Sequence, residues 1–330
     1  MINVIFTIDY EIYGNGEGSL KDHILIPTYH LKKLFDQYNA KIVFFVEAAE
    51  LEKIEEAKSD AAIDDIKNQI AILYSEDHEI ALHLHPQWYN GKYNNGQWVL
   101  DNSEYNLCIL PEKRIAQIVD QSINYLRYIL KSSDYNPLSF RAGNWLFQPT
   151  QPIANILLQR NIKIDSSVFK GGLQHQHRLD YRPALPNGYF WAFKDDVNKP
   201  DVNGKMMEFP IYVNMVPPWW MATGKRLGLQ QKAATKSRTL RGTIYKLMDM
   251  ARPLQPLKFD FCRMTLKELT DMMNKLIAED QQSPELFKPI VAIGHTKDLV
   301  DVETVNLFLS YLKQREIKIT TFQEIINECI

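Results

Sequence analysis

The feature of this sequence that most constrains its fold is the alternation of short apolar runs with longer segments of helical period. The first runs cover residues 2–8, 41–46 and 78–84 and are rich in β-branched and aromatic residues. Helical segments follow the first two, one opened by Ile26-Pro27 and one over residues 48–75. Strands that alternate with helices form parallel sheets, so the pattern predicts an α/β fold.

The same alternation returns later in the chain. We expect a helix from Pro111, strands at 138–141 and 162–165 with a helix between them, and final strands at 289–294 and 317–320, each followed by a helix. Residues 167–260 do not follow the alternation. Because single (β/α) barrels commonly span about 250 residues and grow by loop insertion, we expect one domain over residues 1–330, with 167–260 as an insertion or elaborated loops.

Composition and charge indicate the setting in which the protein works. The net charge of -2 gives no general attraction for nucleic acid. The three cysteines, Cys108, Cys262 and Cys329, are far apart and odd in number, as expected of reduced thiols. The residues after Met1 do not resemble a signal peptide, and no run of 18 apolar residues occurs. We therefore expect a cytoplasmic protein with no nucleic-acid partner.

Polar residues stand at the carboxyl ends of nearly all the expected strands, where parallel α/β folds place their chemistry. Such an end residue taken alone is more often a helix cap or a packed side chain, but five coincident ends favour a site. Side chains alternate along a strand, so Asp9 shares a face with Glu11, and His83 with His85. One carboxylate and two imidazoles suit zinc, cobalt or iron. The end residues considered are Asp9, Glu11, His83, His85, Arg141, Asp165 and His295.

The ordered motifs resemble those of the NodB-homology polysaccharide deacetylases, carbohydrate esterase family 4 and its relatives. The resemblance spans residues 3 to 325 apart from 167–260, and implies a partial or distorted (β/α) barrel of about seven strands. The motifs are T-x-D at 7–9, H-E-I-x-x-H at 78–83, F-R-x-G-x-W at 140–145, D-S-S at 165–167 and G-H at 294–295.

The resemblance also implies roles for single residues. Asp9 matches the general base, Arg141 the arginine that orients it, and His295 the general acid. Asp165 matches a supporting acid and Trp145 the aromatic wall of the pocket. The metal-binding acid of the family usually follows the base directly; Tyr10 stands there, so Glu11 takes this role. Gly143 replaces the usual proline of the third motif.

A second departure from the family concerns the metal ligands. Family members usually carry H-x-x-x-H, and this spacing from His83 reaches Gln87. Two alternatives follow. His85, on the same strand face as His83, replaces the second histidine, or Gln87 itself is a weak ligand.

The sequence thus predicts a metal-dependent hydrolase that removes an N-acetyl group from a sugar of a polysaccharide or glycan precursor, with zinc as the expected ion. Residues 86–110 form a long loop rich in aromatic and polar residues, and Trp88, Tyr89 and Trp145 are candidates for stacking on a sugar. Packing within the loop explains these side chains equally well. The alternatives are hydrolysis of another amide or imide C–N bond, and a carbohydrate-binding protein that has lost its metal, which Gln87 and Tyr10 would favour.

One stretch carries strongly one-sided charge. In residues 219–258, Trp219-Trp220 precede nine basic residues, from Lys225 to Lys258, against a single acid, Asp249. Such a run is usually a solvated helical face. The alternative is peripheral contact with an anionic membrane surface, or with the phosphates of a carrier-linked sugar.

Overall fold

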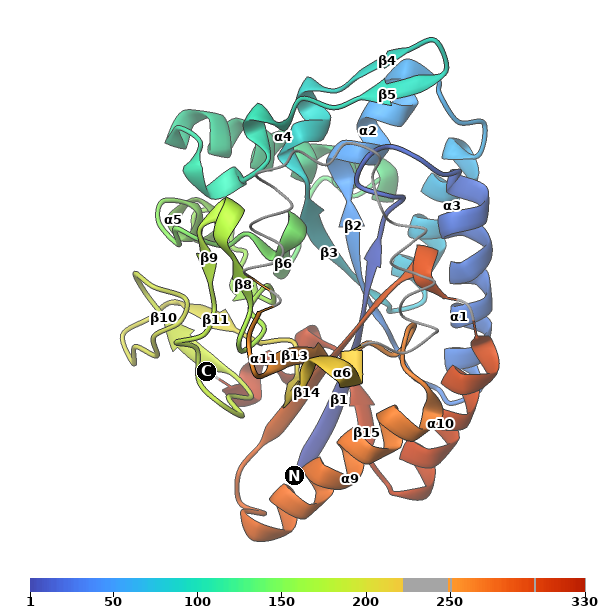
Figure 1. Cartoon of the computed structure of the whole chain (residues 1–330). Helices are drawn as coiled ribbons and strands as arrows, with labels where there is room; N and C mark the ends of the chain where they lie inside the picture. The colour runs from blue at the N-terminus through green and yellow to red at the C-terminus, as the bar shows by residue number, and fades with distance from the viewer. Residues whose placement is uncertain (222–248, 250, 300, 330) are drawn as a thin grey trace.

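The protein is described here by a computed structural model, which places residues 1–221, 249, 251–299 and 301–329 (Figure 1). Within this part of the chain, the main sheet holds nine strands in the order β10-β11-β7-β6-β3-β2-β1-β14, with β15 also paired to β1. All neighbours are parallel except β10 and β11. The strands are β1 (Ile2–Tyr10), β2 (Val43–Glu47), β3 (Glu79–Leu84), β6 (Ser139–Ala142), β7 (Ile164–Asp165), β10 (Trp191–Phe193), β11 (Met206–Glu208), β14 (Lys288–His295) and β15 (Lys318–Thr320).

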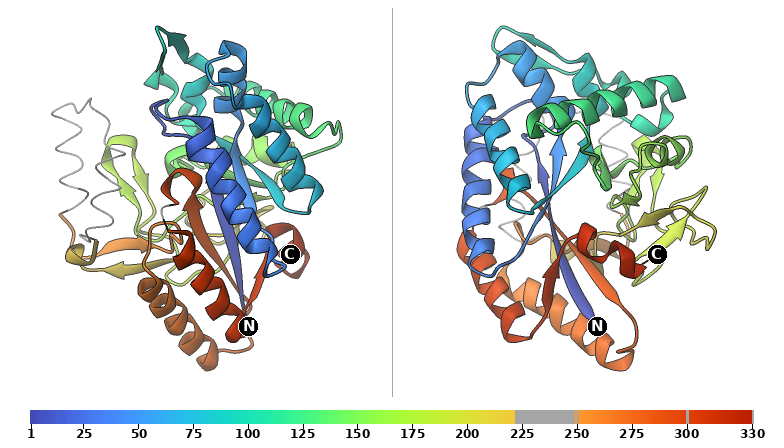
Figure 2. Two further views of the ribbon diagram at one scale, coloured as in Figure 1. Left: turned by 90° about the vertical axis from the view of Figure 1, so that its right-hand side faces the viewer. Right: turned by 180° about the vertical axis from the view of Figure 1, so that it is seen from behind.

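The long helices lie around the outside of this curved sheet (Figures 1 and 2). The N-terminus of α11 is capped as the sequence predicts, because the side chains of Thr321 and Glu324 each accept a hydrogen bond from the other residue's backbone N–H. None of the described helices is both long and apolar enough to cross a membrane. The helices are α1 (Ile26–Asp36), α2 (Ala48–Ala57), α3 (Ile63–Ser75), α4 (Glu112–Leu130), α5 (Ile153–Leu158), α6 (Pro218–Met221), α9 (Leu266–Gln282), α10 (Val302–Gln314) and α11 (Phe322–Cys329).

The expected partial barrel is confirmed, and its closure is incomplete in a specific way. Beyond β11, Ile211 forms isolated parallel bridges to Phe169 on one side and to Val291 of β14 on the other. The N–H of Tyr212 donates to the carbonyl of Val291 at 3.0 Å. The two ends of the sheet are therefore joined by single bridges rather than by a continuous strand.

Part of the segment predicted to be an insertion belongs to this barrel. Residues 167–260 supply β10, β11 and the bridging residue Ile211. The other strands of this segment form two small antiparallel pairs. These are β8 (Leu173–Gln174) with β9 (Leu179–Asp180) and β12 (Val213–Val216) with β13 (Gln255–Lys258).

Two other segments differ in detail from the sequence-based expectation. The helix expected over 48–75 is divided into α2 and α3, because Lys58 ends α2 in a left-handed conformation with φ of 50°. The long loop at 86–110 contains a short hairpin of β4 (Lys92–Asn94) and β5 (Gln97–Val99).

Strand register sets the position of the polar strand ends. In the pairing of β1 with β14, Asp9 lies opposite His295. In the next strands, Glu47 lies opposite His83, and His83 opposite Arg141. All of these side chains are buried. The same pairing that forms the hydrophobic core of the barrel thus brings these groups together at one end of it.

Candidate active site

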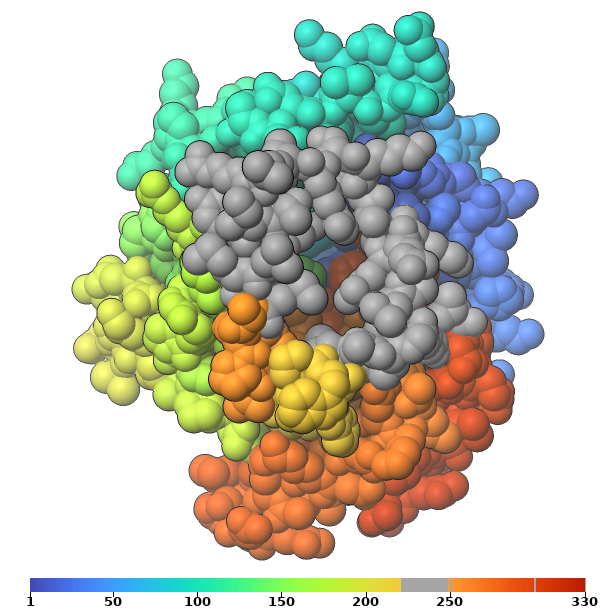
Figure 3. Space-filling model, in the orientation of Figure 1, coloured from blue at the N-terminus to red at the C-terminus, as the bar shows by residue number. Residues whose placement is uncertain are grey.

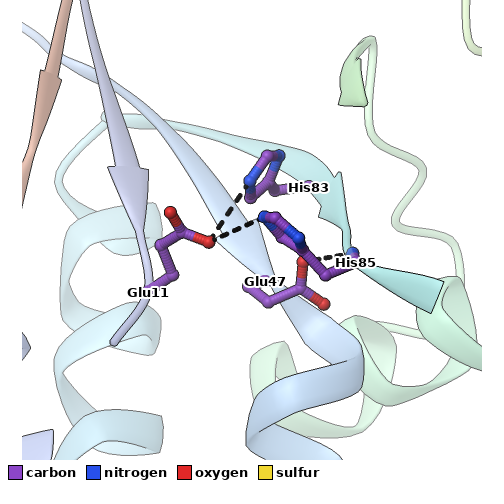
Figure 4. Close-up of side chains that lie close together, drawn as sticks. All are labelled: Glu11, Glu47, His83 and His85. Atoms are coloured by element: carbon purple, nitrogen blue, oxygen red, sulfur yellow. Dashed lines mark hydrogen bonds and ion pairs between the residues drawn. The ribbon is translucent and has the colours of Figure 1, made fainter. Parts of the chain in front are cut away.

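Four buried side chains at the carboxyl ends of β1, β2 and β3 point toward one another (Figure 4). They are Glu11, Glu47, His83 and His85, and each offers one ligand-type atom within 4.8 Å of the others. Glu11 Oε2 lies 3.4 Å from Nε2 of His83 and 3.1 Å from Nε2 of His85. Two imidazole nitrogens and carboxylate oxygens are a donor set that zinc accepts.

The hydrogen bonds behind the two imidazoles orient them for such a role. Nδ1 of His83 donates to the carbonyl of Arg141 at 2.8 Å, which leaves the lone pair of Nε2 directed at the cluster. Nδ1 of His85 lies 3.3 Å from the side-chain amide of Gln87, whose Oε1 is buried and has no hydrogen-bond partner in the described structure. The amide nitrogen of Asn144 lies 3.2 Å from the same Nδ1, so Nδ1 accepts from these amides and Nε2 faces Glu11 Oε2, where a bound cation would replace its proton. Of the two alternatives for the second imidazole position, His85 therefore faces the cluster and Gln87 lies behind it.

A glycine allows His85 to occupy this position. A Cβ atom on Gly143 would lie 2.5 Å from the carbonyl oxygen of Leu84 and 2.8 Å from the ring of His85. The next two residues, Asn144 and Trp145, have φ of 54° and 61°, which is uncommon for residues other than glycine. Strained backbone of this kind is concentrated at functional sites.

The balance of charge in the cluster favours a bound cation. Burial opposes ionisation of Glu11, but Lys297, whose Nζ lies 2.7 Å from Glu11 Oε1, and His85 outweigh it and hold the pKa of Glu11 well below its usual value. Burial raises the pKa of Glu47 to about 8 and that of Glu50 well above its usual value. Within the described part of the chain, Lys297 is the ammonium group that contacts these carboxyl groups. A divalent cation would favour the ionised forms of Glu47 and Glu50, so the residues present fit a metal.

A second group of polar side chains adjoins this cluster and is built on an ion pair. Arg141 Nη1 donates to Asp9 Oδ1 at 2.6 Å, and both side chains are almost fully buried. Asp9 Oδ2 lies 3.3 Å from Nε2 of His295. Burial raises the pKa of Asp9, but Arg141 and the nearby histidines outweigh this effect and lower it. Asp9 is thus kept ionised beside an imidazole.

The carboxylate beside Nδ1 of His295 is that of Asp298, whereas Asp165, the predicted supporting acid, lies elsewhere. Oδ2 of Asp298 lies 3.6 Å from Nδ1 of His295 and accepts from Nε of Arg263 at 2.8 Å. Asp165 instead accepts from the hydroxyl of Ser167 at 2.7 Å and shares a hydrogen bond with Glu208, and burial raises its pKa to about 6. Among the described residues, the carboxylates within 4.0 Å of the His295 imidazole are those of Asp9, Glu11 and Asp298, and Asp165 is not one of them.

Of the three aromatic side chains predicted to contact a sugar, only Trp145 lies beside the catalytic candidates. Its ring centroid is 6.4 Å from that of His295. Trp88 is fully buried and packs edge-on against Trp98 at 5.1 Å, so its ring has no face open to a ligand. The hydroxyl of Tyr89 donates to Glu52 of α2, which ties this side chain to a helix outside the barrel.

Three residues of the site received no role in the sequence analysis. Glu47 ends strand β2 and could have been found by applying the strand-end rule to the run at 41–46. Lys297 and Asp298 lie two and three residues after His295, but nothing in their spacing shows that one pairs with Glu11 and the other with His295. The basic stretch lies mostly at 222–248, outside the described residues. Trp219 and Trp220, which precede it, are 72% and 55% exposed.

The face of the molecule shown in Figure 3 is hollowed at its centre, and atoms from the N-terminal, middle and C-terminal parts of the chain are visible in the hollow. This is the view expected of a barrel mouth at which strands far apart in sequence converge.

The fold is that of the polysaccharide deacetylases, and solved structures of three kinds of enzyme share it. A Mycobacterium smegmatis protein assigned to the polysaccharide deacetylases superposes with a TM-score of 0.56 at 13% identity, covering 99% of this chain and 89% of that one. Puue allantoinase superposes with a TM-score of 0.52 at 13% identity, covering 98% and 88%. The 4-alpha-glucanotransferase of Thermococcus litoralis reaches 0.54 at 13% identity, covering 99% of this chain and 40% of its own. No protein-family model and no curated protein sequence matches the chain.

Proposed function

We propose that this protein is a metal-dependent hydrolase that removes an N-acetyl group from a sugar of a polysaccharide or glycan precursor. The observation that carries the proposal is the buried cluster of Glu11, Glu47, His83 and His85 beside the Asp9–Arg141 pair and His295. The order of the motifs along the chain supports the same function, as does the polysaccharide-deacetylase fold.

The residues divide into those that hold a cation and those that move protons. Glu11, His83 and His85 would hold a divalent ion, with Glu47 within reach as a further oxygen donor. When bound, such an ion supplies Lewis-acid polarisation of the acetyl carbonyl. Lys297 fixes one oxygen of Glu11 at 2.7 Å, so the other oxygen faces the histidines.

Asp9 is the general base in this mechanism, since it is held ionised and directed by Arg141. It removes a proton from the attacking water as the water oxygen bonds to the acetyl carbon. Burial lowers the pKa of His295 to about 4, so the imidazole starts neutral and must gain its proton during the reaction. Asp9, 3.3 Å from Nε2, is the neighbouring source. His295 then protonates the sugar nitrogen as the C–N bond breaks, because an unprotonated amine is a poor leaving group.

Acetate release from N-acetylated amino sugars by the zinc-loaded protein tests this function. We expect release from N-acetylhexosamine oligomers or glycan precursors, lost in the Asp9→Asn variant. Opening of cyclic amides or imides without acetate release would instead support the other C–N hydrolase. No turnover of either kind, together with no bound metal, would support a carbohydrate-binding protein.

A further inference from the structure

Lys258, the last residue of β13, stands beside the candidate active site with its charged end against two aromatic rings. Its Nζ lies 2.9 Å from the ring centroid of Trp145 and 4.0 Å from that of Phe169. The ring of Trp145 in turn adjoins that of His295. Burial lowers the pKa of Lys258 well below its usual value, and the charges of Asp260 and Arg263, followed by those of Asp9 and Arg141, also act on it. Lys258 therefore belongs electrostatically to the same site.

The other cations around the site each have a carboxylate partner, and Lys258 differs from them. Arg141 pairs with Asp9, Lys297 with Glu11, and Arg263 with Asp298. Across the described ranges, no carboxylate lies within 4.0 Å of Lys258 Nζ and no acceptor forms a hydrogen bond with it. Lys258 as a whole is only partly buried, so part of the residue is in contact with solvent.

We propose that Lys258 binds an anionic group of the substrate, a phosphate or a carboxylate, close to the reacting acetamide. This inference rests on the proposed function and narrows it: the substrate would be an acidic N-acetylated sugar or a sugar phosphate rather than a neutral glycan.

The physical argument is that an ammonium group taken out of water needs a compensating partner. The faces of Trp145 and Phe169 supply part of it through cation–π attraction. An anion supplies the rest through a charge-assisted hydrogen bond, which is stronger than one between neutral groups. The binding of an anion would also raise the pKa of Lys258 toward its usual value.

Equilibrium binding to the full-length, zinc-loaded Asp9→Asn variant, which should not turn the ligands over, tests the inference. The ligands are N-acetylglucosamine, its 1-phosphate and N-acetylglucosaminuronic acid, which separate the neutral, phosphate and carboxylate cases, together with inorganic phosphate. Lys258→Met keeps the aliphatic stem, and Lys258→Arg keeps the charge. Lys267→Met removes the same charge from an 83% exposed side chain on α9 and is the matched control.

At least one anionic sugar should bind about tenfold more tightly than N-acetylglucosamine, and Lys258→Met should abolish this difference. Lys258→Arg should restore part of it, Lys267→Met should have no effect, and the neutral sugar should bind all variants alike. Equal loss for neutral and anionic sugars, or no loss for either, would overturn the inference and leave Lys258 a packing residue.

If no sugar binds at all, the proposed function fails, and inorganic phosphate still tests Lys258. The affinity for phosphate should then fall about tenfold in Lys258→Met. An unchanged affinity would overturn the inference on its own.

Discussion

Strands β3 and β14 carry buried polar residues at both ends, but the surroundings of these residues differ between the two ends. At the base of the barrel, Glu79 begins β3 and accepts hydrogen bonds from Ser139 Oγ at 2.8 Å and from the backbone N–H of Gln323 at 2.9 Å. Lys288 begins β14, and its Nζ pairs with Asp280 at 2.8 Å. Nearby protein groups thus form hydrogen bonds with the buried Glu79 and an ion pair with the buried Lys288.

At the mouth, β3 carries His83 just before its last residue and β14 ends in His295, and here ligand-type atoms gather. Glu11, Glu47 and the two histidines converge within 4.8 Å. The difference between the two ends follows the direction of the strands. In barrels of parallel strands, the amino end serves stability and the carboxyl end serves chemistry.

The largest effect on activity should come from Asp9→Asn at the mouth. Removing the general base should lower kcat roughly 10² to 10⁴-fold. Arg141 keeps its hydrogen bonds to Thr7 and Ser166, so the fold should survive. Acetate release and metal content are measured together. Loss of metal along with activity would make Asp9 a ligand rather than a base.

His295→Ala should lower the rate about 10²-fold on an amide, because the sugar nitrogen leaves only when protonated. An activated aryl acetate has a leaving group that needs no proton, so its hydrolysis should fall much less. The ratio of the two rates isolates the role of the acid. Equal losses on the amide and the ester would remove His295 from the proton-transfer step.

Gly143→Ala should act at the mouth through geometry alone. The added methyl group cannot fit between the Leu84 carbonyl and the ring of His85, so the imidazole must move. We expect zinc affinity to fall about tenfold, the lower end of the effect of disturbing the groups around a ligand. Gly14→Ala is the control, since a Cβ there meets nothing within 4 Å. An unchanged affinity in Gly143→Ala would argue that His85 does not hold the metal.

At the base, Glu79→Gln should leave activity and metal binding unchanged and alter only stability. Burial raises the pKa of Glu79 from 4.5 to about 7. The folded protein therefore binds this proton more tightly than the unfolded chain, so the stability it confers is complete below 4.5 and is lost as the pH rises through 7. Relative to the variant, the wild type should lose up to about 3 kcal/mol of unfolding free energy across this window. Denaturant unfolding of both proteins at a series of pH values measures this loss. A difference in unfolding free energy that does not change with pH would show that Glu79 does not titrate in this window.

The barrel and the convergence at its mouth could be predicted from the sequence because both depend on local patterns. Strand periodicity places Asp9, His83 and His295 at strand ends, and parallel strands end at one edge of a sheet. The closure of the barrel through Ile211 could not be predicted, since a single bridging residue produces no alternating pattern in the sequence. The sequence left two explanations open for Trp88, and its burial against Trp98 of the same loop agrees with packing. Asp298 was overlooked as the neighbour of His295 because a turn after β14, not the strand pattern, places it there.

The central claim is that the mouth of the barrel, and not its base, binds a metal ion. The most direct test is zinc binding by the purified full-length protein, compared between substitutions at the two ends of β3. We predict about one ion per chain in the wild type and in Glu79→Gln, and an affinity at least about 100-fold weaker in His83→Ala. No stoichiometric zinc in the wild type, or binding by His83→Ala as tight as by the wild type, would contradict the account.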